Sequence, residues 1–84
     1  MTAKVALVTG TSTGLGLATS IHLAKKGYKV YATMRNLDKR VALDKEAEAQ
    51  GVSLSVMRLD VRDTATVQQC VDAIMEQEGR YTYI

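Results

Sequence analysis

Short continuous apolar runs alternate along the chain with longer segments in which apolar residues recur at helical spacing. The runs KVALV (4–8), YKVYATM (28–34) and VSLSVMRL (52–59) predict strands, and the second is rich in β-branched and aromatic residues. A fourth run, YTYI (81–84), looks like the beginning of another strand. A run that is apolar throughout, such as residues 4–8, indicates a strand covered on both faces.

Helices are expected in the segments between these strands. The first covers residues 15–26. Asp38 is expected to cap the second, which runs to about Gln50, and Asp63 or Thr64 to begin the third. Each segment is followed by a glycine, a residue that commonly ends helices: Gly27, Gly51 and Gly79.

The order of elements, strand–helix repeated and then a last strand, predicts a parallel sheet. Helices of about 12 residues between strands act as right-handed crossovers. We therefore expect an α/β fold of Rossmann type, with helices on both faces of the sheet. The length of 84 residues and the absence of proline indicate one domain without a linker.

The segment LVTGTSTGLGLA (7–18) places three glycines between the first strand and the first helix. Unpaired N–H groups at the positive end of that helix favour an anion. Gly10 allows a tight turn, Gly14 lets the backbone approach a ligand, and Gly16 lets the helix pack closely on the sheet. Three hydroxyls are expected to add donors to the same rim: Thr11, Ser12 and Thr13. The loop suits a diphosphate; the alternative is a tight turn without a ligand.

The glycine spacing in TGTSTGLG resembles that of the short-chain dehydrogenase/reductase family. YATMRN (31–36), LDV (59–61) and EGRYTYI (78–84) extend the resemblance along nearly the whole chain. It implies that residues 1–84 are the N-terminal part of an NAD(P)-binding Rossmann domain, with strand order 3-2-1-4 and truncated in the fourth strand. YATMRN particularly resembles members that act on steroids, retinoids and similar carbonyl or alcohol substrates.

The resemblance also implies cofactor contacts. Those to the phosphates and the adenosine ribose would come from Gly10, Ser12, Gly14, Leu15 and Gly16. Leu15 would act through its backbone. Asp60 would accept a hydrogen bond from the adenine amino group, and the backbone N–H of Val61 would reach a ring nitrogen. The alternative for Asp60 is a cap or turn residue before the third helix.

Charge at the end of the second strand bears on the choice of cofactor. Enzymes that prefer NAD place an acid there to bind the ribose hydroxyls, and this chain has Met34 followed by Arg35. Methionine does not repel a 2′-phosphate, and the guanidinium of Arg35 matches one, with Asn36 as an additional donor. The sequence favours NADP(H) over NAD(H). The alternative is that Arg35 is a solvated loop residue.

No catalytic residue is expected within the 84 residues. The family transfers hydride between nicotinamide and a carbonyl or alcohol, using a serine, a tyrosine and a lysine four residues after the tyrosine. Neither Tyr81 nor Tyr83 is followed by such a lysine. We expect the chain alone to be inactive. A fragment, a frameshifted product and a naturally short protein remain open, as does a non-catalytic nucleotide-binding or interaction module.

Composition limits the partners. The 11 basic and 9 acidic residues are interspersed, which disfavours a nucleic-acid surface, and no apolar run is long enough to span a membrane. His22 is expected on the surface or against another helix and Cys70 in the core, so we expect no metal site. One cysteine and no signal peptide fit a cytoplasmic protein. A short last strand leaves an open sheet edge, through which self-association is expected.

Overall fold

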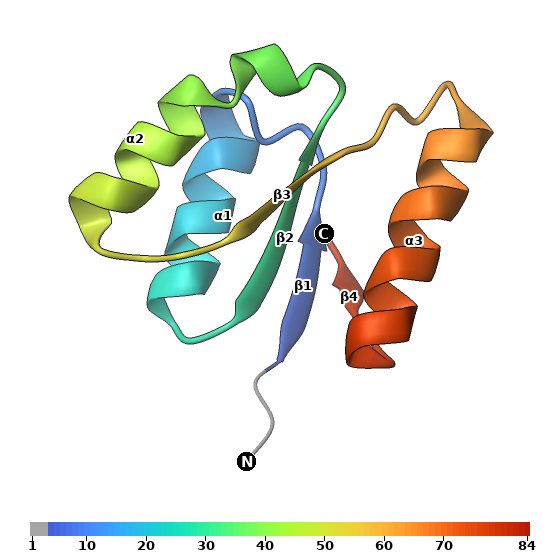
Figure 1. Cartoon of the computed structure of the whole chain (residues 1–84). Coiled ribbons are helices and arrows are strands. Elements are labelled where there is room, and N and C mark those ends of the chain that lie inside the picture. Colours follow the sequence, from blue (N-terminus) through green and yellow to red (C-terminus); the bar gives the residue numbers. More distant parts are fainter. Residues whose placement is uncertain (1–3) are drawn as a thin grey trace.

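A parallel sheet forms the middle layer of the protein, which the computed structural model describes over residues 4–84 (Figure 1). Its four strands are β1 (Val5–Val8), β2 (Lys29–Met34), β3 (Ser55–Arg58) and β4 (Thr82–Tyr83). They lie in the order β3-β2-β1-β4, which confirms the expected fold class and strand order. Because all neighbours are parallel, their carboxyl ends meet at one edge, the upper one in Figure 1.

The helices cover both faces of this sheet. Helices α1 (Gly14–Lys25) and α2 (Val41–Gln50) lie on one face, and α3 (Thr64–Glu78) lies on the other (Figure 1). The crossover from β3 to β4 carries α3 back across the sheet to the other side of β1. Within the described part of the chain, this arrangement leaves β4 at the edge of the sheet, paired with β1 alone.

Successive side chains of the strands supply two separate cores. Ala6 and Val8 of β1 pack with buried residues of α1 and α2, whereas Val5 and Leu7 pack with buried residues of α3. Both faces of β1 are therefore apolar, as its uninterrupted run of apolar residues predicts. Cys70 is buried in the α3 core as expected, and burial raises the pKa of its thiol.

The expected helix boundaries hold best where a side chain or a glycine determines them. Asp63 caps α3, since its carboxylate accepts a hydrogen bond from the Ala65 N–H at 3.1 Å. Gly51 and Gly79 end α2 and α3 with φ of 69° and 74°, the left-handed conformation that favours glycine. The third strand is shorter than expected, because only Ser55–Arg58 pairs with β2.

The expected start of the second helix is wrong. Asp38 does not cap it; instead, Asn36 Oδ1 accepts a hydrogen bond from the Asp38 N–H at 3.0 Å and begins a short 3₁₀ helix, η1 (Leu37–Lys39). Helix α2 starts only at Val41. Asparagine and aspartate both bond readily to the backbone two residues ahead, and here the earlier of the two does so.

A polar cluster ties the end of α3 to β2. The Tyr31 hydroxyl donates to Glu78 Oε2 at 2.6 Å, and Lys29 Nζ lies 2.6 Å from the same oxygen. These two partners hold the pKa of the Glu78 carboxyl below its ordinary value of 4.5. The ionised carboxylate is therefore bound more strongly in the folded than in the unfolded chain.

Glu78→Gln is expected to lower the free energy of unfolding at pH 7, because it removes this ionised acceptor. A carboxyl with a lowered folded-state pKa stabilises above its unfolded pKa and loses the effect as pH falls through the folded pKa. Urea denaturation should therefore show the deficit at pH 7 and its disappearance well below pH 4.5. Glu76→Gln, an exposed position on the same helix, is the control. A deficit that does not change with pH would contradict the assignment.

Candidate functional site

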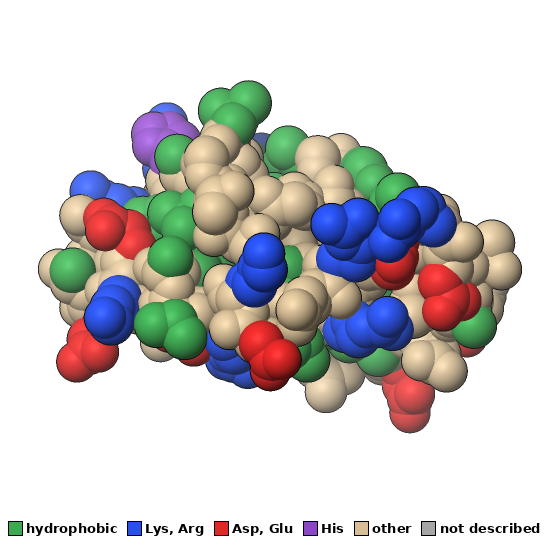
Figure 2. Space-filling view, turned by 90° about the horizontal axis from the view of Figure 1, so that it is seen from above, with side chains coloured by type: hydrophobic (Ala, Val, Ile, Leu, Met, Phe, Trp, Pro, Cys, Tyr) green, Lys and Arg blue, Asp and Glu red, His purple; other side chains and the backbone are tan. Residues whose placement is uncertain are grey.

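A hollow of about 380 Å³ opens at the carboxyl ends of β1, β2 and β3. It is lined by the loops that follow these strands, through Thr9, Gly10, Ser12, Met34, Arg35, Leu59, Asp60, Val61 and Arg62. Figure 2 looks onto this edge and shows several basic side chains grouped there. Ligands of open parallel sheets bind outside the carboxyl ends of the strands, so this edge is the candidate site.

Two other hollows lie elsewhere on the described residues. One of about 340 Å³ is formed where β2 and β3 begin, and one of about 650 Å³ is formed where β1 begins, beside β4. Neither is lined by any residue that the sequence singled out for the site. Both lie away from the carboxyl ends of β1, β2 and β3, where the ligand is expected to bind.

The glycine loop brings the start of α1 directly against the end of β1. Gly10 and Gly14 have φ of 65° and 59°, a conformation that side-chain-bearing residues rarely adopt. A Cβ on Gly16 would lie 2.1 Å from the Gly10 carbonyl oxygen, so only glycine fits at this position. A Cβ on Gly14 would meet nothing, and Gly14 therefore faces open space.

Thr11 lies behind the loop, contrary to the expectation that its hydroxyl adds to the rim. The side chain is fully buried, and both its hydroxyl and its N–H donate to the Thr33 carbonyl, at 3.0 and 3.1 Å. Thr33 in turn donates its hydroxyl to the Val8 carbonyl at 2.8 Å. These bonds fix the loop onto the ends of β1 and β2, a connection that the sequence did not reveal.

The N-terminus of α1 presents backbone donors without side-chain competition. Thr13 is its N-cap residue, but the side chain makes no capping hydrogen bond, and the first turn contains no acid. The first N–H groups of a helix have no partner within it, and together they attract anions. Ser12, which lines the hollow, and the exposed Leu15 flank this end of the helix.

The three residues expected to recognise a ribose phosphate differ in position. Met34 lines the hollow, but its side chain is 2% exposed and belongs to the core beneath α1 and α2. Arg35 is exposed, and its guanidinium has no hydrogen bond or ion pair within residues 4–84. Asn36 caps η1 and is not among the lining residues.

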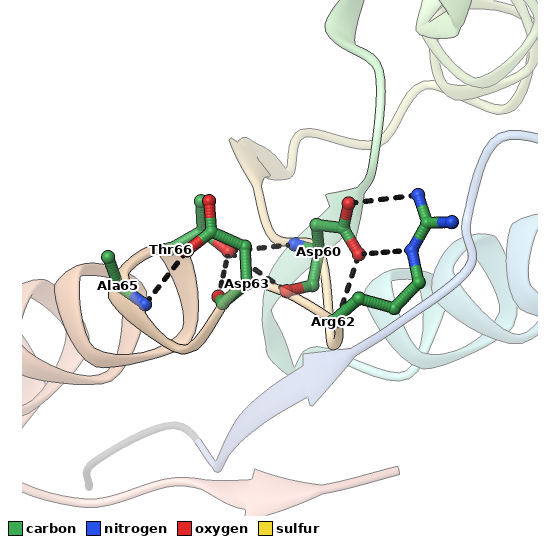
Figure 3. Close-up of polar contacts among 5 residues, drawn as sticks. All are labelled: Asp60, Arg62, Asp63, Ala65 and Thr66. Atoms are coloured by element: carbon green, nitrogen blue, oxygen red, sulfur yellow. Dashed lines mark hydrogen bonds and ion pairs between the residues drawn. The ribbon is translucent and has the colours of Figure 1, made fainter.

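Asp60 is held by a residue that the sequence analysis missed. Its carboxylate pairs with Arg62, with Nε–Oδ1 and Nη2–Oδ2 distances of 3.2 Å, and Oδ1 also accepts the Arg62 N–H at 3.0 Å (Figure 3). These contacts, chiefly the side-chain one, lower the pKa of Asp60. Asp60 is therefore a turn residue that also lines the hollow. It does not cap α3, because the N-cap residue of that helix is Asp63.

Thr66 braces the same loop from the first turn of α3. Its hydroxyl accepts a hydrogen bond from the Asp60 N–H at 3.0 Å and lies 2.8 Å from the Asp63 carbonyl (Figure 3). With the backbone of Asp60 fixed, the exposed Val61 projects beside the hollow. The signal for both missed residues, Arg62 and Thr66, was their short spacing after an aspartate that follows a strand.

No group of three or more histidine, cysteine, aspartate or glutamate side chains among the described residues could hold a metal ion. None of the helices within residues 4–84 is both long enough and apolar enough to cross a membrane.

Residues 4–82 match the short chain dehydrogenase family, and the chain belongs to it. It is 43% identical to human retinol dehydrogenase 8 over 75 residues, covering 84% of this chain and 24% of the relative. It is 42% identical to rat estradiol 17-beta-dehydrogenase 1 over 73 residues, covering 80% and 21%. A metagenomic short-chain oxidoreductase solved in complex with NADP has a TM-score of 0.83 and 28% identity, covering 95% and 36%. The chain thus spans about a fifth to just over a third of the length of these proteins.

Gly16→Ala is expected to destabilise the protein by about 1–3 kcal/mol, the usual cost of forcing extra atoms into a packed site. In an ordinary helix the same change stabilises by up to about 1 kcal/mol, so the sign is the test. Urea denaturation provides the measurement. The neighbouring Leu15→Ala, at a position 83% exposed, should change the free energy of unfolding by no more than about 0.5 kcal/mol. Equal stability of Gly16→Ala and the parent would refute the close approach.

Proposed function

We propose that this chain is the NADP(H)-binding part of an oxidoreductase of the short-chain dehydrogenase family. One observation supports this most directly: the unpaired guanidinium of Arg35 and the buried carboxylate of Asp60 line the same hollow beside the glycine loop. A dinucleotide requires all three features together: the glycine loop for its diphosphate, a cation for its ribose phosphate and a hydrogen-bond acceptor for its adenine.

The residues present fit the phosphates of a dinucleotide. The first turn of α1 has glycine where a side chain would clash or face the ligand, at Gly16 and Gly14. The helix end offers N–H groups and no acid in its first turn, so a diphosphate meets donors and no repulsion. Ser12, at the hollow, would donate its hydroxyl to the same group.

The loop after β3 fits an adenine. Asp60 presents acceptor oxygens at the hollow, and the ordered backbone holds them there. The Val61 N–H makes no backbone hydrogen bond within the described residues and would reach a ring nitrogen. Such a pair, one acceptor and one donor on successive residues, matches the amino group and neighbouring nitrogen of adenine.

The preference for NADP(H) rests on charge at the end of β2. Arg35 offers a planar fork of donors that suits a phosphate dianion. The side chain of Met34 lies in the core, so no acid competes for the ribose hydroxyls at that position. The NADP complex of the metagenomic relative shows that the family accommodates this cofactor.

The bound nicotinamide would supply hydride transfer to or from a carbonyl or alcohol carbon. The names of the retinol and estradiol relatives support an apolar alcohol or ketone as substrate class of the complete enzyme. Tyr31 is not a general base for this reaction, since its pKa is raised, chiefly by burial, and its hydroxyl faces Glu78. We expect the 84 residues alone to bind nucleotide without turning over substrate.

A non-catalytic interaction module is the second candidate. Among residues 4–84 no strand pairs with the outer edge of β4, and Tyr83 and Ile84 are 57% and 45% exposed. An open edge with apolar side chains favours pairing with a second copy of the chain.

Arg35→Ala is expected to abolish a preference for 2′,5′-ADP over 5′-AMP. The loss in binding free energy of 2′,5′-ADP should be on the order of 1.5–3 kcal/mol, the range for a hydrogen bond to a charged group. Calorimetry measures both affinities, with Lys39→Ala as a control that removes a nearby charge outside the hollow. Equal affinities of the parent chain for the two nucleotides would reject the NADP(H) assignment.

The purified chain is expected to self-associate through β4. Sedimentation velocity at micromolar concentration should show a dimer or larger species, since unpaired edge groups recruit another strand. Tyr83→Lys places a charge on that edge and should shift the protein toward monomer. A single species of 9.2 kDa at all concentrations would contradict the proposal.

A further inference from the structure

Three charged side chains line the hollow: Arg35, Asp60 and Arg62. Two of them neutralise each other, because Arg62 holds both carboxylate oxygens of Asp60 at 3.2 Å. The third, Arg35, has no ion pair within residues 4–84. The hollow therefore contains one cation that is not committed to a carboxylate.

Asp60 and Arg35 line the same hollow, so their charges act on each other there. The charge of Arg35 is the last and smallest of the causes that lower the pKa of Asp60, after those from Arg62. A carboxylate with no other partner would draw this guanidinium toward itself, because arginine and carboxylate form a bidentate pair. It would also repel a phosphate that bound to Arg35. Either effect would weaken an anion site beside Asp60.

Local backbone geometry gives Arg62 the advantage in this competition. Its N–H donates to Asp60 Oδ1 at 3.0 Å, so the turn that begins at Asp60 already positions its side chain. Thr66 fixes the backbone at the start of that turn. Arg35 comes from a different loop, after β2, and has no comparable anchor.

We propose that Arg62 is a specificity-determining residue: by neutralising Asp60, it leaves Arg35 free to bind the 2′-phosphate of the cofactor. This inference rests on the proposed NADP(H) function. It assigns to Arg62 an effect on the 2′-phosphate that requires no contact with the cofactor. Arg62 acts through Asp60 and is a positioning residue.

The pairing leaves Asp60 able to recognise adenine. Oδ1 accepts two hydrogen bonds from Arg62, but Oδ2 accepts only one. A carboxylate oxygen has two lone pairs, so Oδ2 retains capacity for the amino group of adenine. Arg62 thus removes the charge of the carboxylate from the neighbourhood of the phosphate without occupying the whole acceptor.

The test is the ratio of affinities for 2′,5′-ADP and 5′-AMP, measured by calorimetry on the full chain. Arg62→Ala should lower this ratio about three- to tenfold, the order of effect of one unmasked charge acting within a largely aqueous site. Adding Asp60→Asn to Arg62→Ala should restore the ratio, since the side chain at position 60 then carries no negative charge that Arg62 would have to neutralise. Arg62→Lys keeps the charge but loses the planar fork of donors, so its affinity ratio should lie between those of the parent chain and Arg62→Ala.

Arg58→Ala is the matched control, because Arg58 is an exposed arginine at the end of β3 that does not line the hollow. A ratio unchanged in Arg62→Ala, or not restored by Asp60→Asn, would overturn the inference while leaving the cofactor assignment intact. A parent chain without any preference for the 2′-phosphate would overturn both. The side chain of Arg62 is 71% exposed, so its replacement should leave the fold in place, which circular dichroism verifies.

Discussion

The close approach of Gly16 to the Gly10 carbonyl is the constraint on which the candidate site depends. With no Cβ at position 16, α1 can begin directly at the end of β1, where a methyl group would lie 2.1 Å from a backbone oxygen. This contact orients the helix N-terminus toward the carboxyl edge of the sheet. The bonds of Thr11 to the Thr33 carbonyl then fix the intervening loop to β2. Backbone donors can serve a phosphate only when they are held in this way before it binds.

The parallel arrangement of the strands also brings the loops after β2 and β3 to the candidate site. Because β1, β2 and β3 are neighbours that run in one direction, the segments after them meet at one edge. Each is shaped by local bonds: Asn36 begins η1 after β2, and Asp60 with Arg62 forms the turn after β3. Short-range side-chain-to-backbone bonds thus determine what each loop presents, and the sheet determines that they present it together.

Periodicity and glycine position were sufficient to predict the helices and a parallel sheet, because both depend on patterns that repeat along the chain. The strand order was implied by the resemblance to the short-chain dehydrogenase/reductase family. The errors have one physical origin. Thr11 and Asp38 were assigned from spacing, but burial determines where the Thr11 side chain points, and the neighbouring Asn36 makes the hydrogen bond where Asp38 was expected to cap. Arg62 was missed for the same reason: a charged residue two positions after an aspartate becomes informative only when the turn brings the two together. The ligand contacts themselves remain predictions.

The hollow and the cluster that fastens α3 lie at opposite ends of the strands. The lining residues all precede α3, whereas Lys29, Tyr31 and Glu78 join the start of β2 to the end of that helix. The lining residues come from the end of β2 and from the loops that follow β1, β2 and β3, while α3 and β4 add core packing and a short edge strand. A cation that binds a 2′-phosphate and a carboxylate that accepts a hydrogen bond from adenine would pair with each other if left alone, and the carboxylate would repel the phosphate. The pairing of Asp60 with a neighbour in its own turn separates these two functions within a single hollow.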